Sequence, residues 1–299
     1  MWLLLAFCSA FCLGFYDVFK KISLKENAIL PVLALNTLFS ASIFLPFLYF
    51  SVITDSIEKE SLFYVASLSV ENHAYVLLKS VIVLSSWIFG YMGMKHLPIT
   101  IVGPINATRP IFTLLGALFI FGEQLNLYQW IGICLGMLSI YLLSKVGKRE
   151  GVNFKHNKWV ICLFVAAVLG AISGLYDKFL MQFIPPMAVQ AWYTQYQCLL
   201  MGSVILFIWY PQRKKTTPFH WSYAIPFISL FVSIADFAYF YALSMEDALI
   251  AVVSMIRRGS VLVSFAIGAF FLKEQNVRQK FWDLLLILIG MLFLYFGSK

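Results

Sequence analysis

Apolar runs separated by short polar connections repeat along the whole chain. A helix that crosses a bilayer needs roughly 20 largely apolar residues, and ten runs approach that length. The pattern predicts an all-α integral membrane protein with ten transmembrane helices. We expect them at residues 2–19, 29–50, 74–94, 99–121, 127–144, 159–181, 187–210, 223–243, 248–272 and 281–296. The first run lacks a basic leader and a clean cleavage site, so we expect a first span and not a cleaved signal peptide.

Parts of the first five runs recur in the last five. Residues 14–19 read GFYDVF and residues 174–179 read GLYDKF. Residues 102–126 and 253–276 both carry arginine within an apolar run, and both lead through Glu-Gln to a glycine-containing span. Recurrence of this kind indicates a duplicated unit. We expect one repeat at residues 1–146, a basic linker at 147–158 and a second repeat at 159–299.

The number of spans in each repeat determines how the repeats are related. Because five is odd, the second repeat enters the membrane with the opposite orientation to the first. Two inverted five-helix repeats are typical of secondary transporters, whose substrate site lies near the midplane between the halves. The pattern therefore favours a transporter that works by alternating access.

Composition excludes a soluble protein. Hydrophobic residues make up 61% of the chain and charged residues 12%, whereas roughly a quarter of a typical soluble domain is charged. The net charge of +8 does not indicate nucleic-acid binding, because the basic residues lie in short connections. The histidines and cysteines show no metal-ligand spacing, so we expect neither a metal nor a cofactor.

Lysine and arginine are distributed unequally between the two sets of connections. Fifteen lie in the odd-numbered connections: Lys20, Lys21, Lys25, Lys95, Lys145, Lys148, Arg149, Lys155, Lys158, Arg213, Lys214, Lys215, Lys273, Arg278 and Lys280. Four are counted on the even side, namely Lys59, Lys79, Lys178 and Lys299. Cytoplasmic connections carry the excess of basic residues. We therefore expect odd connections in the cytoplasm and both termini outside.

The repeated segments resemble a known family. Pro104 and Pro110 precede an apolar run that ends in Gly122-Glu123-Gln124, and a glycine-rich span follows. This pattern resembles the EamA-type repeat of the drug/metabolite transporter superfamily, and two copies cover essentially the whole chain. The resemblance implies a ten-helix alternating-access carrier for amino acids or other small metabolites, often exported. It also implies a central cavity lined mainly by the first, third, fourth, sixth, eighth and ninth spans.

The second copy departs from the family pattern. It reads Arg257-Arg258-Gly259-Ser260 where the family usually has a proline and apolar residues, and Lys273 precedes its Glu274 where glycine is usual. These departures prevent a direct transfer of substrate from other members.

Charged residues within spans are the first candidates for a functional site. A charge at the bilayer centre costs between about 2.5 and 17 kcal/mol, so it normally faces a cavity or a partner. The candidates are Asp17, Arg109, Asp177, Asp236, Arg257 and Arg258. Arg109 forms a polar stripe with Asn106 and Thr113 at helical spacing. It either anchors an anionic substrate group or pairs with a carboxylate.

Adjacent positions in a helix point about 100° apart, so Arg257 and Arg258 cannot both face one narrow cavity squarely. We expect one of them to line the pathway, near Ser254, Ser260 or Ser264. We expect the other to pair with a carboxylate, and Asp236 in the eighth span is the favoured partner.

Asp17 and Asp177 occupy matching places in the two repeats. They act either in proton coupling or gating, or as ion pairs at helix ends, where Asp17 has Lys21 four residues later. Tyr16 and Tyr176 either line the cavity or lie at the membrane interface. In the unusually polar seventh span, Trp192 and Gln195 are further candidates for substrate binding, and an interfacial aromatic belt is the alternative.

These candidates favour a secondary transporter of a small polar metabolite, anionic or zwitterionic, such as an amino acid, in the cell membrane. A broad-specificity exporter is the alternative. A membrane-embedded enzyme is a second class of function, but the sequence shows no paired His/Asp or Ser/His constellation for catalysis. A channel is the third class of function. The expected partners are a small-molecule substrate, the lipid bilayer and, for a proton-coupled carrier, protons. We expect no nucleic acid, and a monomer or homodimer.

Overall fold

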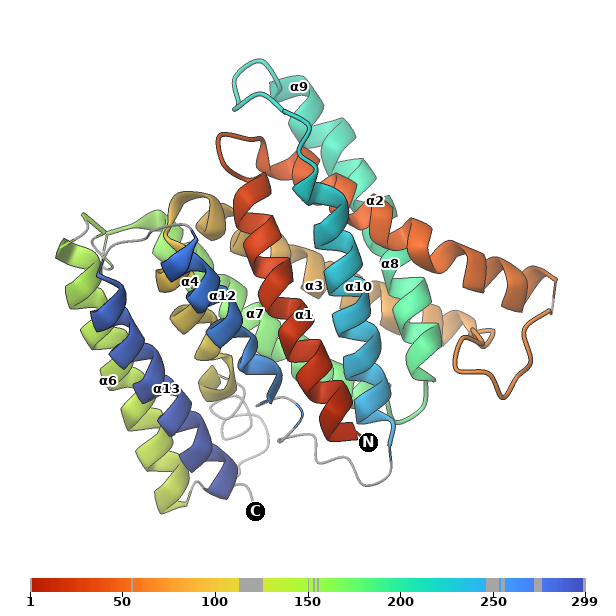
Figure 1. Ribbon diagram of the computed structural model, residues 1–299. Coiled ribbons are helices and arrows are strands. Elements are labelled where there is room, and N and C mark those ends of the chain that lie inside the picture. Colours follow the sequence, from red (N-terminus) through yellow and green to blue (C-terminus); the bar gives the residue numbers. More distant parts are fainter. Residues whose placement is uncertain are drawn as a thin grey trace.

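The structure is a computed structural model, and every regular element among its described residues is a helix (Figure 1). It describes residues 2–54, 56–112, 126–149, 151–152, 154, 156–245, 253, 256–271 and 276–297. The elements are α1 (Trp2–Ser23), α2 (Ile29–Leu48), η1 (Tyr49–Ile53), α3 (Val70–His96), α4 (Ile99–Ala107), α6 (Leu127–Arg149), α7 (Lys158–Leu180), α8 (Pro186–Val204), η2 (Ile205–Trp209), α9 (Tyr210–Gln212), α10 (Ala224–Leu243), α12 (Ser260–Phe270) and α13 (Val277–Gly297).

The helices follow the ten predicted runs. Within the described residues, seven are long and apolar enough to cross a membrane: α1, α2 with η1, α3, α6, α7, α10 and α13. The seventh run is α8, which the π-helical turn η2 extends. The fourth and ninth runs are represented by α4 and α12. The motif at residues 122–124 and its counterpart near Glu274 lie outside the described residues.

Local chemistry explains where several helices begin. The Ser69 hydroxyl accepts a hydrogen bond from the Asn72 amide at the start of α3, and Asn157 does the same for Trp159 at the start of α7. Each side chain satisfies an amide that has no partner within its helix. Pro98 precedes α4 and Pro186 opens α8, where a missing amide hydrogen costs nothing.

Helices of the first half pack most extensively against helices of the second half. The pairs are α1 with α10, α3 with α7, α2 with α8, α4 with α12 and α6 with α13. If each helix is replaced by its counterpart in the other half, the α1–α10 pair becomes the α7–α3 pair. The other three pairs are unchanged by this exchange. A two-fold relation between the repeats produces this pairing. Figure 1 shows α6 beside α13 and α1 beside α10, with both termini at the same end of the molecule.

The α6–α13 pair depends on small residues. A Cβ atom added at Gly132 would lie 2.7 Å from the Gly290 carbonyl oxygen, and one at Gly290 would lie 3.0 Å from that of Gly132. The two backbones can approach this closely only because both positions are glycine, as in other packed membrane helices.

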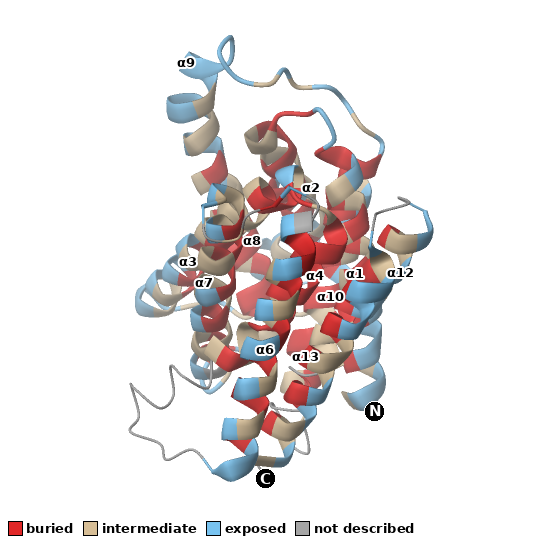
Figure 2. Ribbon diagram, turned by 90° about the vertical axis from the view of Figure 1, so that its left-hand side faces the viewer, coloured by how far each residue is buried: buried red, intermediate tan, exposed pale blue. Residues whose placement is uncertain are grey.

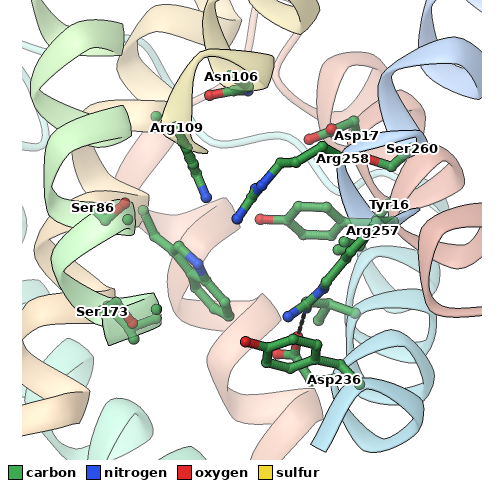
Figure 3. A pocket seen from close by; sticks show the side chains of 18 of the residues that line it. Tyr16, Asp17, Ser86, Asn106, Arg109, Ser173, Asp236, Arg257, Arg258 and Ser260 are labelled. Carbon is green, nitrogen blue, oxygen red and sulfur yellow. Dashed lines mark hydrogen bonds and ion pairs between the residues drawn. The ribbon is translucent and has the colours of Figure 1, made fainter. Parts of the chain in front are cut away.

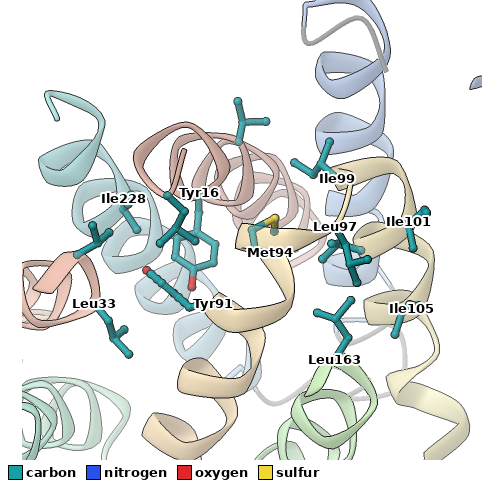
Figure 4. Packing of buried hydrophobic residues seen from close by; sticks show 14 of the residues in the cluster. Tyr16, Leu33, Tyr91, Met94, Leu97, Ile99, Ile101, Ile105, Leu163 and Ile228 are labelled. Carbon is teal, nitrogen blue, oxygen red and sulfur yellow. The ribbon is translucent and has the colours of Figure 1, made fainter. Parts of the chain in front are cut away.

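Buried residues lie on the inner faces of the helices and exposed residues on the outer faces (Figure 2). Exposed large hydrophobic residues such as Leu4 and Phe207 cover outward helix faces, where lipid would meet them. Inside, one cluster gathers residues mainly of α1, α2, α3, α4, α7 and α10, including Tyr16, Tyr91 and Leu97 (Figure 4). A second cluster includes Tyr193 and Phe240. Tyr16 and Tyr91 from the first cluster, and Tyr193 and Phe240 from the second, also line the cavity described next.

Candidate functional site

A cavity of about 150 Å³ lies in the centre of the helix bundle. Its lining comes from α1, α3, α4, α7, α10 and α12, from Arg109 after α4, from Arg257 and Arg258 before α12, and from Tyr193 of α8. Apart from Tyr193, these are the six spans that the family resemblance implies. Figure 3 shows the side chains of Tyr16, Arg109 and Arg258 directed into this space.

Charged side chains dominate the cavity. Five cations line it, namely Lys20, Lys79, Arg109, Arg257 and Arg258, and three carboxylates, namely Asp17, Asp177 and Asp236. The formal charge of the described lining therefore has an excess of two positive charges. Burial in a low-dielectric interior strengthens every interaction among these groups.

Each carboxylate has a basic partner. Asp236 forms an ion pair with Arg257 and also accepts a hydrogen bond from the Tyr193 hydroxyl at 2.8 Å. The Arg257 guanidinium lies over the Tyr239 ring, 4.0 Å from its centroid. The structure therefore contains the ion pair expected between Asp236 and one of the adjacent arginines. Arg258, the other arginine, extends toward the centre of the cavity (Figure 3).

The two repeat-related aspartates have different partners. Asp177 pairs with Lys79 of α3, and the Lys79 ammonium lies over the Tyr193 and Phe240 rings. Asp17 pairs with Lys20 of its own helix at 2.6 Å. The alternative that paired Asp17 with a base near the end of its helix therefore holds with Lys20 and not with Lys21. The Lys21 ammonium donates to the carbonyl oxygens of Met94 and Leu97 at the end of α3.

Arg109 and Arg258 approach each other across the cavity (Figure 3). The two guanidinium groups repel each other electrostatically. Arg109 also packs against the backbone of α7. A Cβ atom added at Gly170 would lie 2.8 Å from its Cζ atom, so a glycine is needed for the guanidinium to occupy this place. A guanidinium has the shape and charge to bind a carboxylate or a phosphate, so two of them close together suit an anionic group.

Both spans that carry the arginines are interrupted at matching positions. Thr108 ends α4 and its amide donates to the Ile105 carbonyl at 3.2 Å, whereas the Gly259 amide donates to Ile256 at 2.9 Å. Ile111 and Leu262 make the next such bonds, to Thr108 and Gly259 respectively. Each position in the second span lies 151 residues after its counterpart. Arg109 follows the first interruption and Arg258 precedes the second, so the turns bring the two arginines in from opposite sides.

Three candidates do not line the cavity. The Tyr176 hydroxyl donates to the Tyr75 carbonyl at 3.2 Å, and Gln195 donates to the Ala41 carbonyl at 2.9 Å. Trp192 packs edge-on against His73, with 4.5 Å between ring centroids. These side chains are used in contacts between helices because their faces of α7 and α8 point toward α3 and α2. Thr113 and Ser254, also expected near the arginines, lie outside the described residues.

Lys79 is a site residue that the reading of the sequence assigned to a connection. It is 2% exposed and lies well inside α3. With Val83, Ser86 and Gly90 it forms a stripe along one face of that helix, and all four line the cavity. This spacing of small and polar residues inside an apolar run was the signal that could have identified Lys79.

Comparison with known proteins agrees with the fold. The model of the EamA-like transporter family matches residues 1–145 and again residues 157–296. A solved crystal structure that is 14% identical aligns with 99% of this chain and 96% of its own, with a TM-score of 0.65, which shows a common fold.

A curated relative matches part of the chain. The uncharacterized transporter YoaV of Bacillus subtilis (strain 168) is 27% identical over 162 residues, which are 52% of this chain and 53% of that protein. The chain thus matches about half the length of this relative. The two family matches together cover all of the described residues that line the cavity. This protein is therefore a multi-pass membrane protein and a member of the EamA-like transporter family.

Proposed function

We propose that the protein is a secondary active transporter that moves a small anionic or zwitterionic metabolite, such as an amino acid, across the cell membrane. One observation supports this choice of substrate above all. The described lining of the central cavity has two more cations than carboxylates. Each of those carboxylates already has a basic partner. A substrate that brings a carboxylate into this space offsets the positive excess.

The position of Arg109 and Arg258 supports the same assignment. Their guanidinium groups converge at the centre of the cavity (Figure 3), and a guanidinium binds a carboxylate through two parallel hydrogen bonds. A substrate carboxylate between them would replace repulsion with attraction. The direction of transport, export, rests on the family resemblance alone.

Ligand-dependent thermal stability tests this proposal. Purified protein should be stabilised by anionic or zwitterionic metabolites, because a ligand that binds only the folded state raises the melting temperature. In Arg109→Ala the affinity should fall at least about tenfold, which corresponds to about 1.4 kcal/mol. Saturable counterflow of the same compound into liposomes would establish a carrier. Equal stabilisation of the wild type and Arg109→Ala would contradict the role of Arg109.

We also propose that the termini lie outside and that the odd-numbered connections lie in the cytoplasm. Lys20, Lys79 and Lys280 are buried, and without them the basic residues still divide thirteen to three in favour of the odd connections. A fluorescent reporter that matures only in the cytoplasm should stay dark when fused to Lys299. A bright fusion would contradict this orientation.

A further inference from the structure

A second pocket, of about 330 Å³, lies beside the central cavity. It is formed by the segment 59–66, the start of α8 and the end of α10. Phe240 is 3% exposed and lines both spaces. A single aromatic side chain therefore contributes to the wall between the second pocket and the central cavity.

The polar feature of this pocket is Gln190 on α8. Its side chain is 99% buried, and neither its amide nitrogen nor its amide oxygen has a hydrogen-bond partner among the described residues. Burying a carboxamide without partners is unfavourable, so a buried amide usually has one. Because Gln190 also lines the pocket, a ligand there can supply an acceptor and a donor side by side.

An aromatic stack forms another part of the wall. Phe63 stacks on Phe237 with 5.7 Å between ring centroids, and Phe237 stacks on Tyr241 with 6.0 Å. Phe237 and Tyr241 line the pocket. Aligned rings present a continuous apolar surface, which suits the apolar body of a small solute.

The charge of this pocket differs from that of the central cavity. The charged residues of its described lining are Lys59 and Glu60, one of each sign. Both are exposed. The lining therefore carries no formal net charge, and it favours a solute whose own charges are balanced or absent.

We propose that this pocket is a second solute-binding site, a vestibule beside the central cavity for small molecules without net charge. The Gln190 carboxamide binds a neighbouring donor and acceptor on the solute, as an amino-acid head group or a primary amide offers. Phe237 and Tyr241 hold an apolar body. Binding of a solute in this pocket does not depend on the proposed transport function. Only the placement of the site on the substrate path rests on that function.

Protection of an introduced thiol tests the site without any transport assay. Ser61 lines the pocket, so Ser61→Cys is made in a chain whose five native cysteines are replaced by alanine. Labelling by N-ethylmaleimide is then timed in detergent with three probes: L-phenylalanine, 3-phenylpropionamide and 3-phenylpropionate. The zwitterion and the amide should slow labelling about fourfold at three times their Kd. The anion should leave the rate unchanged.

A matched variant identifies the anchor. Gln190→Met keeps the length of the side chain and removes both polar groups, so protection should disappear. The melting temperature should stay the same or rise, because an unsatisfied buried amide has been removed. Arg109→Ala should keep full protection, and this separates failure of the central site from failure of the vestibule.

Four results would overturn the proposal: none of the probes protects Ser61→Cys, the anion protects as well as the zwitterion, protection survives in Gln190→Met, or that variant unfolds. The last result would show that Gln190 supports the fold instead of binding solute.

Discussion

The two halves of the chain each supply four charged side chains to the central cavity, but they use them differently. In the first half, Asp17 pairs with a lysine on the same helix. In the second half, Asp177 reaches across to α3 of the first half, and Asp236 pairs with Arg257 of the next span. A pair within one helix persists when that helix moves as a rigid body. Pairs between helices depend on how the helices are placed.

This difference identifies which interactions a change of access would disturb. The Lys79–Asp177 pair joins the two halves, so rocking of one half against the other must move or break it. The Asp17–Lys20 pair can remain intact throughout. Repeat-related aspartates can therefore have unequal roles, one as a tie between halves and the other as a local feature of α1.

The largest effect is expected from Asp236→Asn, which removes the ion pair between two helices of the second half. Arg257 would be left partly buried without its carboxylate, and the Tyr193 hydroxyl would lose a charged acceptor. Removing one partner of a buried pair costs about 3–5 kcal/mol. Thermal unfolding and the yield of monodisperse protein measure this loss. Adding Arg257→Met to the same chain should restore most of it, and unchanged stability in the single variant would contradict a structural pair.

Smaller losses of stability, unequal in size, are expected from Asp17→Asn and Asp177→Asn. Lys79 lies deep inside α3, so its loss of Asp177 should cost about 3 kcal/mol. Lys20 is near the end of α1 and can extend its ammonium toward the interface, so loss of Asp17 should cost about 1 kcal/mol. Melting temperatures of the two purified variants give the comparison. Equal losses would show that the two aspartates are equivalent.

The smallest effect on stability, with a clear effect on binding, is expected from Gly170→Ala. The new methyl group would displace the flexible guanidinium of Arg109 and leave the helices in place. Affinity for an anionic ligand should fall about tenfold, or about 1.4 kcal/mol. Gly202→Ala is the control, because a Cβ atom there meets nothing within 4 Å and Gly202 lies outside the cavity. Unchanged affinity in Gly170→Ala would show that Arg109 does not need its observed position.

The fold was largely predictable from the sequence because apolar runs and their recurrence are local signals. The pairing of helices was not, since α1 meets α10 and α3 meets α7 through contacts that no local pattern specifies. Charged residues inside apolar runs identified Arg109 and Asp236, because such residues need a cavity or a partner.

Polar residues were less informative than charged ones. Trp192 and Gln195 lie in a polar part of their span, yet Trp192 packs against His73 of α3 and Gln195 donates to the Ala41 carbonyl. Composition cannot tell whether a polar helix face meets a cavity or another helix. Lys79 shows the opposite failure, in which a buried cation was counted with the connections.

The pairing of helices across the two halves has a consequence for the order in which the protein forms. The principal partner of α1 is α10, more than 200 residues later, and the partner of α6 is α13 at the end of the chain. Helices inserted early during synthesis must wait in the bilayer for partners that have not yet been made. This delay is tolerable because a membrane helix can insert by itself before it packs against other helices. Compaction of this transporter is therefore a late event, completed only when its last helix has entered the membrane.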